Sequence, residues 1–451
     1  MGIAMVSNPR ARAANPFGDP RMKSQIPPLR TELLAGLTTF LTMSYIVVVN
    51  PSILSSPGTG IPFSGALSAT VLLACLMTLM MGLYADLPFA VAPGMGINAF
   101  FTYTLILGQG VPWPTALGIV FWAGVIFLAV SITPLRENIA RAVPKSLRLG
   151  AASGIGIFLT FIGLKNAGFI SADPVTFVKA GSLGTEALLS LGGLAVIIAF
   201  MRRRSPLAFL AGIASVTVAA WVLGLTRFPD RLISPPDFES VFFRLDIMGA
   251  LKPALLPAIL SLFFTDLFDS ISTFIGVAHA ANLLDEDGQP RNLRQGLIVD
   301  AFATLGAGLL GTSSGTAYIE SSAGIEMGGR TGRTAVAAAA CFLPCLFLAP
   351  LAAMVPSCAT APVLILVGSF MFKSVRELPV THLEDSVPAF LTVILIPLTF
   401  SITQGILWGF ISHVALYALA GRRREIAPMM WVLASISASL LAIERVGAAV
   451  R

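Results

Sequence analysis

Long apolar stretches, each of roughly 17–25 residues, alternate with short polar loops from near Leu34 to Ala420. Stretches of this length match the hydrocarbon thickness of a bilayer, and we count about fourteen of them. The composition agrees, because 55% of the 451 residues are hydrophobic and only 12% are charged, whereas a soluble domain has roughly 25% charged residues. The pattern predicts an all-α polytopic membrane protein.

Two of the apolar stretches, the third and the tenth, are interrupted by Pro, Gly and Ser at 88–98 and 311–324. Pro removes a backbone donor and Gly weakens a helix, so we expect each segment to be extended first and helical afterwards. Because unpaired backbone cannot face lipid, the two extended pieces must pair or line a cavity. We predict a short antiparallel strand pair at mid-membrane, each strand leading into a half-helix whose N-terminus points at a polar ligand.

The two interrupted spans occupy equivalent places in two sets of seven, which predicts an inverted repeat. An odd number of spans per half makes the second half begin on the opposite side of the membrane. The stretch at 426–443 is left unassigned between an extra span, an interfacial helix and a docking segment. The expected divisions are a cytoplasmic N-terminal segment (1–30), a first repeat with spans 1–7 (31–226), a second repeat with spans 8–14 (247–421) and a C-terminal segment (422–451).

Lys and Arg residues, which give the chain a net charge of +6, cluster in every second loop. The excess of positive charge marks cytoplasmic loops, so we expect a cytoplasmic N-terminus in a bacterial inner membrane. The N-terminal stretch lacks the pattern of a cleavable signal peptide. The clusters are Arg10, Arg12, Arg21, Lys23 and Arg30; Arg136, Arg141, Lys145 and Arg148; Arg202, Arg203 and Arg204; Arg291 and Arg294; Arg330 and Arg333; Lys373 and Arg376; and Arg422, Arg423 and Arg424.

Four acidic residues fall inside apolar spans: Asp266, Asp269, Asp300 and Glu320. A carboxylate in hydrocarbon is costly, so its default interpretation is a binding site or a proton relay. The alternative for Asn98 and Glu320 is a helix cap, and for the aspartates it is a hydrogen-bond network between helices. Asp300 fits a structural lock and a proton path equally well.

Several motifs together resemble the AzgA-like purine permeases of the nucleobase/ascorbate transporter superfamily. The resemblance covers roughly residues 28–420 and implies fourteen spans in two inverted repeats, divided into core and gate domains. It also implies proton-coupled uptake of adenine, guanine or hypoxanthine, and it is consistent with a homodimer. The motifs are Ala92–Phe101, Asp266–Asp269, Gly276–His279, Leu284–Gly288, Gly311–Ser314, Tyr318–Ser321 and Gly328–Gly332.

By this resemblance, the family's functional Asn in the third span matches Asn98, its eighth-span acid matches Asp266 or the competing Asp269, and its tenth-span acid matches Glu320. The resemblance favours Asp266. The run Ser270–Thr273 departs from the family's usual Thr-Thr-Gly-Thr, which affects the shape of the pocket.

A purine is flat and apolar on its faces and has donors and acceptors at its edge, so its pocket needs aromatic walls and a few polar groups. Phe100, Phe268 and Tyr318 are candidate walls. The predicted substrate-binding residues are Asn98, Phe100, Asp266, Phe268, Asp269, Thr316, Tyr318 and Glu320, and the predicted proton-coupling residues are Asp266, Asp300 and Glu320.

Other classes of protein fit the sequence less well. A channel needs a continuous polar pore, whereas the polar residues here gather at two helix breaks. An anion exchanger of the related seven-plus-seven fold would favour basic residues at those breaks. The four cysteines and the remaining motifs indicate no metal site, no cofactor, no nucleic acid and no enzyme. A sodium site would also use acids, so the residues alone leave the choice between protons and sodium open.

Overall fold

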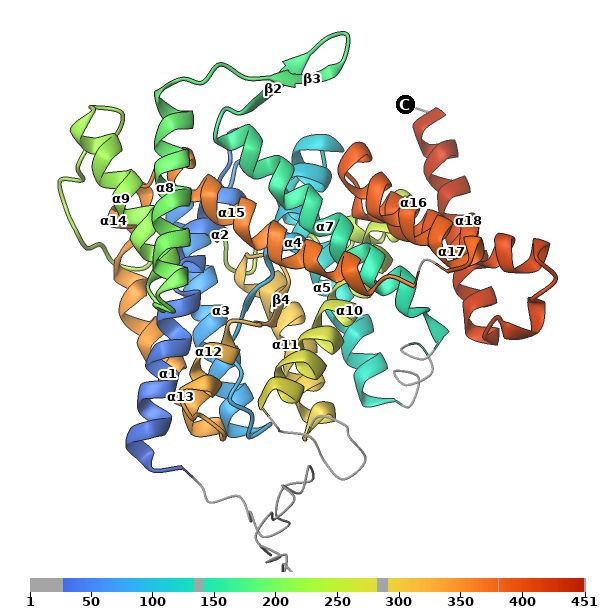
Figure 1. Ribbon diagram of the computed structural model, residues 1–451, viewed down its shortest axis with the longest axis horizontal. Coiled ribbons are helices and arrows are strands. Elements are labelled where there is room, and N and C mark those ends of the chain that lie inside the picture. The colour runs from blue at the N-terminus through green and yellow to red at the C-terminus, as the bar shows by residue number, and fades with distance from the viewer. Residues whose placement is uncertain (1–26, 134–138, 140–141, 282–290, 380, 450–451) are drawn as a thin grey trace, which may run out of the picture.

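The computed structural model describes residues 27–133, 139, 142–281, 291–379 and 381–449, and the fold is built almost wholly from helices (Figure 1). Residues 1–26, Arg136, Arg141 and the motif Leu284–Gly288 lie outside the described residues. The elements of the first half are α1 (Leu29–Met43), α2 (Ile46–Leu54), α3 (Phe63–Leu83), β1 (Val91–Pro93), α4 (Met95–Ala99), the π-helix η1 (Phe100–Gly108), α5 (Trp113–Ile132), α7 (Lys145–Asn166), β2 (Ile170–Asp173), β3 (Phe177–Ala180), α8 (Thr185–Arg202) and α9 (Ala208–Val222).

The second half follows the long loop at 227–246 and repeats this order of elements. Its elements are α10 (Leu256–Ala281), α11 (Leu293–Leu310), β4 (Gly315–Ala317), α12 (Ser321–Glu326), α13 (Gly332–Phe342), the 3-10 helix η4 (Leu343–Phe347), α14 (Ala349–Ala353), α15 (Ser357–Phe372), α16 (Leu383–Thr399), α17 (Ile402–Leu419) and α18 (Pro428–Ala449). Within the described residues, nine helices are long and apolar enough to cross a membrane, and four more apolar helices are shorter. The chain is a multi-pass membrane protein. With α1 and α2 as one span, seven segments precede the loop; with α13, η4 and α14 as one span, seven more run from α10 to α17, and α18 follows them.

The predicted strand pair is present and fully buried. Strand β1 pairs antiparallel with β4, with Val91 opposite Ala317 and Pro93 opposite Gly315. Backbone hydrogen bonds extend the pairing by one residue at each end. Gly94 N donates to Ser314 O at 2.9 Å, and Tyr318 N donates to Ala90 O at 2.9 Å. Each strand leads into a short helix, α4 or α12. The antiparallel pairing shows that the two equivalent segments run in opposite directions, as an inverted repeat requires.

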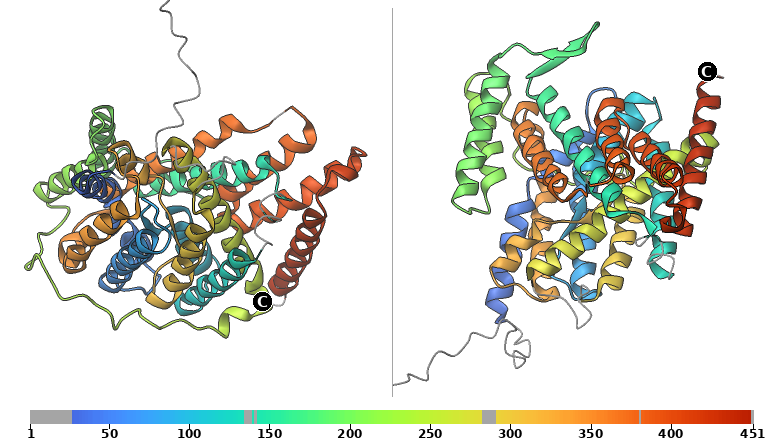
Figure 2. Two further views of the ribbon diagram at one scale, coloured as in Figure 1. Left: turned by 90° about the horizontal axis from the view of Figure 1, so that it is seen from below. Right: turned by 45° about the vertical axis from the view of Figure 1, so that its right-hand side comes forward.

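The helices form two packing groups. The strand body consists of α1–α5 with β1 and η1, and of α10–α13 with β4, which pack mainly against one another. The helical body consists of α7, α8, α9, α15, α16 and α17. Figure 2 shows the two groups from two sides. At Gly96 a Cβ would lie 2.4 Å from Ile155 Cγ2, so glycine is what allows α4 of the strand body to approach α7 of the helical body this closely.

Three features were not predicted from the sequence. A hairpin, β2–β3, extends from the top of the molecule in Figure 1. In its turn Asp173 Oδ1 accepts from Thr176 N and Val175 N, which holds the pKa of Asp173 below its usual value. The third span continues as the π-helix η1, a form that is frequent at functional sites. The unassigned stretch 426–443 falls in helix α18, which packs against α17 and α10.

Candidate functional site

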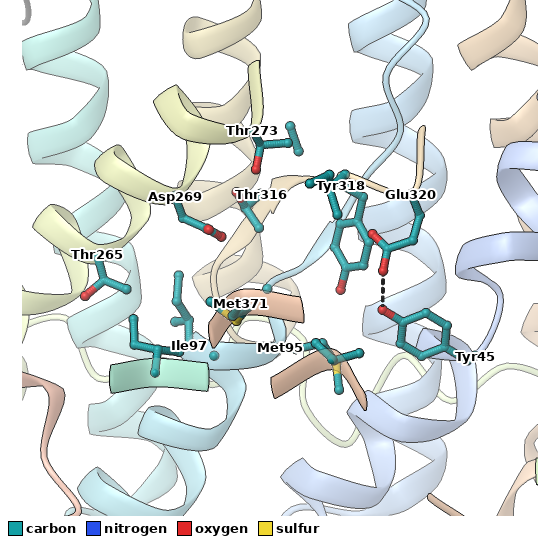
Figure 3. A pocket seen from close by; sticks show the side chains of 16 residues that line it. Tyr45, Met95, Ile97, Thr265, Asp269, Thr273, Thr316, Tyr318, Glu320 and Met371 are labelled. Atoms are coloured by element: carbon teal, nitrogen blue, oxygen red, sulfur yellow. Dashed lines mark hydrogen bonds between the residues drawn. The ribbon is translucent and has the colours of Figure 1, made fainter. Parts of the chain in front are cut away.

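A cavity of about 100 Å³ lies where the paired strands meet the helical body (Figure 3). The strand body provides most of its wall, through α4, α10, β4 and the start of α12, and the helical body closes it with α7 and α15. We call it the central cavity. It is lined by Tyr45, Gly94, Met95, Gly96, Ile97, Ile155, Thr265, Asp269, Thr273, Thr316, Ala317, Tyr318, Ile319, Glu320, Val367 and Met371.

Four of the predicted substrate residues come together in this lining: Asp269, Thr316, Tyr318 and Glu320. Asp269 is on α10, Thr316 is the middle residue of β4, and Glu320 immediately precedes α12. In Figure 3 the Asp269 carboxyl and the Tyr318 ring point into the pocket from opposite sides. A bound molecule would therefore lie between the Asp269 carboxyl and the Tyr318 ring, with the Glu320 carboxyl on the side of that ring.

Backbone from both helix breaks reaches the cavity. Gly94 to Ile97 line it from the third span, and Ala317 to Glu320 line it from the tenth. The start of each half-helix thus faces the same cavity, and this is the position at which the sequence pattern predicts a polar ligand.

Tyr45 was not identified from the sequence. It lies between α1 and α2, is fully buried, and donates a hydrogen bond from its hydroxyl to Glu320 Oε1 at 2.7 Å. The only sequence signal was the pair Ser44-Tyr45 in the middle of an apolar span. This contact fixes the orientation of the Glu320 carboxyl and joins the first span to the tenth.

Tyr318 is held by the strand pair itself. Its hydroxyl donates a hydrogen bond, 2.5 Å long, to the carbonyl of Pro93, the last residue of β1. The ring therefore has a fixed position at the cavity wall, as a rigid aromatic platform requires.

Asp266, the residue that the resemblance favours, lies outside the lining of the central cavity. It is fully buried, and its Oδ2 accepts from Ser314 Oγ at 2.7 Å and from Thr304 Oγ1. Its Oδ1 is buried without a hydrogen-bond partner among the described residues. Asp266 thus links α10 to α11 and to the segment before β4, whereas Asp269, one turn later, faces the cavity.

Asp300 is also behind the wall and is connected to the cavity through hydroxyl groups. Ser270 Oγ donates to Asp300 Oδ2 and lies 3.1 Å from Thr316 Oγ1. Since Ser270 has one proton to donate and gives it to Asp300, Thr316 donates to Ser270. The path from the cavity to Asp300 is therefore a continuous row of hydrogen bonds.

The remaining predicted residues do not contribute to the lining. Asn98 is fully buried, and its Oδ1 accepts from Ser313 Oγ, which ties α4 to the segment before β4. Phe100 is buried away from the cavity, and Phe268 stacks on Phe264 with ring centroids 5.9 Å apart. Tyr318 and Tyr45 provide the aromatic surface instead.

The charged side chains that line the central cavity are acidic. Among the described residues that form it there are two carboxyl groups, two phenols and several threonine hydroxyls, with no Lys, Arg or His. A cavity that holds two carboxyl groups at broken helices, between two bodies of an inverted repeat, defines the class as a secondary-transporter fold.

Comparison with known proteins identifies the family. The Permease family profile matches residues 30–407, and the chain belongs to this family. It is 42% identical to the adenine permease AdeP of Escherichia coli strain K12, covering 90% of this chain and 91% of that protein. It is 38% identical to the guanine/hypoxanthine permease PbuO of Bacillus subtilis strain 168, covering 92% of this chain and 97% of that one. The resemblance found in the sequence is confirmed.

The fold also has a solved relative. The transmembrane domain of the cyanobacterial bicarbonate transporter BicA matches with a TM-score of 0.64, covering 84% of this chain and 97% of that one. At 18% identity, this likeness concerns the fold alone.

Proposed function

We propose that this protein imports purine nucleobases, such as adenine, guanine or hypoxanthine, by proton symport. The observation that carries the proposal is the central cavity, whose lining brings the carboxyl groups of Asp269 and Glu320 together with the Tyr318 ring. Ring N–H groups and exocyclic amines of a purine are donors, and carboxylates accept from them. The relatives AdeP and PbuO are named as permeases for such bases.

Proton coupling is supported by the carboxyl groups in and behind the cavity. Burial in a membrane interior favours the neutral form of a carboxyl group, so loading a proton stabilises the carrier during its crossing. Glu320 lines the cavity, and Asp300 is connected to it by hydrogen bonds through Ser270 and Thr316. A row of hydroxyl groups can pass a proton in either direction, because each oxygen both donates and accepts. We assign Glu320 and Asp300 to proton coupling, with Asp266 as a buried acid of the same network.

An elevator-like movement follows from how the wall is divided. We propose that the strand body acts as the core domain and the helical body as the gate domain. The polar lining residues are on the strand body, whereas the helical body contributes only the apolar Ile155, Val367 and Met371. Sliding the strand body along this apolar surface moves the whole set of polar contacts together, because among the described lining residues no hydrogen bond joins the two bodies.

The rival proposal is anion exchange, since BicA shares the fold. A carboxylate in a binding site repels an anion, and a basic side chain attracts one. The described lining of the central cavity offers two carboxyl groups and no basic side chain. The charge of the site thus favours a base with N–H donors over sulfate or bicarbonate.

The test is uptake of labelled adenine, guanine, hypoxanthine, xanthine and uracil in a strain that lacks its own permeases. We expect saturable uptake of at least one purine, inhibited by unlabelled purines and insensitive to sulfate and bicarbonate. Uptake of bicarbonate or sulfate with none of any purine, at normal expression, would overturn the proposal.

A further inference from the structure

A second cavity, of about 340 Å³, lies along the same boundary between the two bodies. We call it the outer chamber. Its walls come from the end of α2 and from η1 on the strand body, and from the end of α7 and the start of α15 on the helical body. The lining includes Ser52, Ser56, Tyr103, Lys165, Asn166 and Thr360.

The outer chamber and the central cavity are built on the same elements. Asn166 follows Ile155, a central-cavity residue, by about three turns of α7, or ~16 Å of helix rise. Thr360 precedes Val367 by about two turns of α15, or ~10 Å. In the strand body, α4 lines the central cavity and continues directly into η1, which lines the chamber. The two cavities are therefore successive spaces on one boundary.

The chamber contains a flat aromatic surface together with a cation. Lys165 Nζ lies 5.7 Å from the centroid of the Tyr103 ring, and Ser56 Oγ lies 3.3 Å from the Tyr103 hydroxyl. Lys165 is exposed and forms no ion pair with a carboxylate in the part of the chain that the structure describes. Because the ammonium is exposed, its contact with the ring face is weak. A molecule with a stronger affinity for the ring can displace it.

The chemistry of the remaining lining suits a nucleobase. Asn166 presents both an amide carbonyl and an NH₂ group, and Ser52 and Thr360 present hydroxyls that donate and accept. Any nucleobase can stack on an aromatic ring, whichever donors and acceptors it has at its edge, because every base has a π-face. The volume is within the roughly 300–1,000 Å³ of small-molecule sites.

We propose that the outer chamber is a second purine-binding site, in which the base stacks on Tyr103 in place of Lys165 before it moves to or from the central cavity. The proposal rests on the proposed function and adds a docking step to it. The chamber has no carboxyl group in its described lining, so it binds the base by stacking and neutral hydrogen bonds. Binding there is consequently weaker and less selective among purines than binding between Asp269 and Glu320.

The experiment measures how fast a cysteine introduced into the chamber wall reacts with a thiol reagent in the purified protein. Leu107→Cys introduces a thiol in the chamber wall at a residue that makes none of the proposed polar contacts, and its reaction with a water-soluble thiol reagent is timed with and without adenine. The unmodified chain, with Cys75, Cys341, Cys345 and Cys358, measures the background. The same measurement is made with Asp269→Asn and Glu320→Gln added, which weakens binding in the central cavity.

We expect adenine to slow labelling of Leu107→Cys several-fold in both backgrounds, with sodium sulfate at equal concentration having no effect. Unchanged labelling in both backgrounds would leave the chamber as a water-filled space and overturn the proposal. Protection that disappears in the Asp269→Asn and Glu320→Gln background would also overturn it, because adenine would then act from the central cavity.

A matched pair of variants separates stacking from structure. Tyr103→Phe keeps the ring and should retain protection, whereas Tyr103→Ala should lose it and raise KM for uptake several-fold without weakening equilibrium adenine binding to the central cavity. Equal protection in both variants contradicts stacking on Tyr103. If the protein neither binds nor transports any purine, the proposed function itself has failed, whereas intact uptake without protection rejects the outer chamber alone.

Discussion

In the proposed function, Glu320 is the residue where substrate contact and proton coupling meet, since it lines the cavity and accepts from the Tyr45 hydroxyl. Glu320→Gln keeps the size of the side chain and the acceptor for Tyr45 but removes the titrating group. We expect the variant to insert and fold normally and to lose concentrative uptake. The measurement is accumulation of labelled purine against a gradient, normalised to the amount of protein in the membrane. Full accumulation by the variant would rule out its coupling role.

The two aspartates of α10 should behave differently. The resemblance favours Asp266, but Asp269 is the one that lines the cavity, and Asp266 accepts from Thr304 and Ser314 behind the wall. We therefore expect Asp269→Asn to weaken equilibrium purine binding by roughly 10- to 100-fold, the loss of about one hydrogen bond to a charged group. Asp266→Asn should change binding less. Direct binding to the purified variants decides the order, and a larger loss in Asp266→Asn would return the substrate contact to Asp266.

Tyr45 provides a third test at the level of one atom. Tyr45→Phe removes only the hydroxyl that donates to Glu320 at 2.7 Å. A half-buried carboxyl without this donor is less well oriented, so we expect purine affinity to fall by about tenfold. Tyr84→Phe is the matched control, because Tyr84 is 53% exposed and lies outside the cavity lining. Equal affinities for Tyr45→Phe and the control would show that the contact does not position Glu320.

At the level of elements, the end of the tenth span is fixed by a buried acid of the first. Glu32 on α1 is fully buried, and its carboxyl accepts from Thr331 Oγ1 at 3.1 Å and from Thr334 Oγ1 at the start of α13. Its negative charge also lies at the N-terminus of α13, where the helix dipole favours it. This contact holds the connection between α12 and α13, and through it the position of Glu320.

We expect Glu32→Ala to lower the free energy of unfolding by about 1–3 kcal/mol for each donor left unpaired. The measurement is thermal unfolding of the purified protein, with Glu326→Ala as the control, since Glu326 is exposed on α12. An unchanged melting temperature in Glu32→Ala would show that the α1–α13 contact does not stabilise this region.

At the level of the whole molecule, the coupling ion is the property to test. If a carboxyl group must be protonated for the loaded carrier to cross, uptake should fall as external pH rises. It should also collapse with a protonophore even when the membrane potential is clamped, and sodium should not substitute. Proteoliposomes with imposed ion gradients separate these cases. Uptake that depends on sodium and is insensitive to pH would reject proton symport.

The sequence by itself determined the membrane class, the two sets of seven spans and the interruptions at 88–98 and 311–324. These features are set by local chemistry: the hydrocarbon thickness fixes span length, and Pro and Gly prevent a continuous helix wherever they occur. The strand pair was predictable for the same reason, since unpaired backbone in a membrane has few alternatives. The family assignment came from motifs, and the comparisons confirm it.

Only the tertiary structure decided which of these residues face the cavity. Asp266 and Asp269 are three residues apart on one helix, and periodicity places them on one side, yet the hydroxyls of Thr304 and Ser314 enclose the first while the second stays at the wall. Tyr45 is about 275 residues from Glu320 in sequence, and no local pattern links them. The outer chamber likewise requires four elements from both halves of the chain. Side-chain spacing along one helix follows from the sequence, whereas contact between helices depends on how their surfaces fit together.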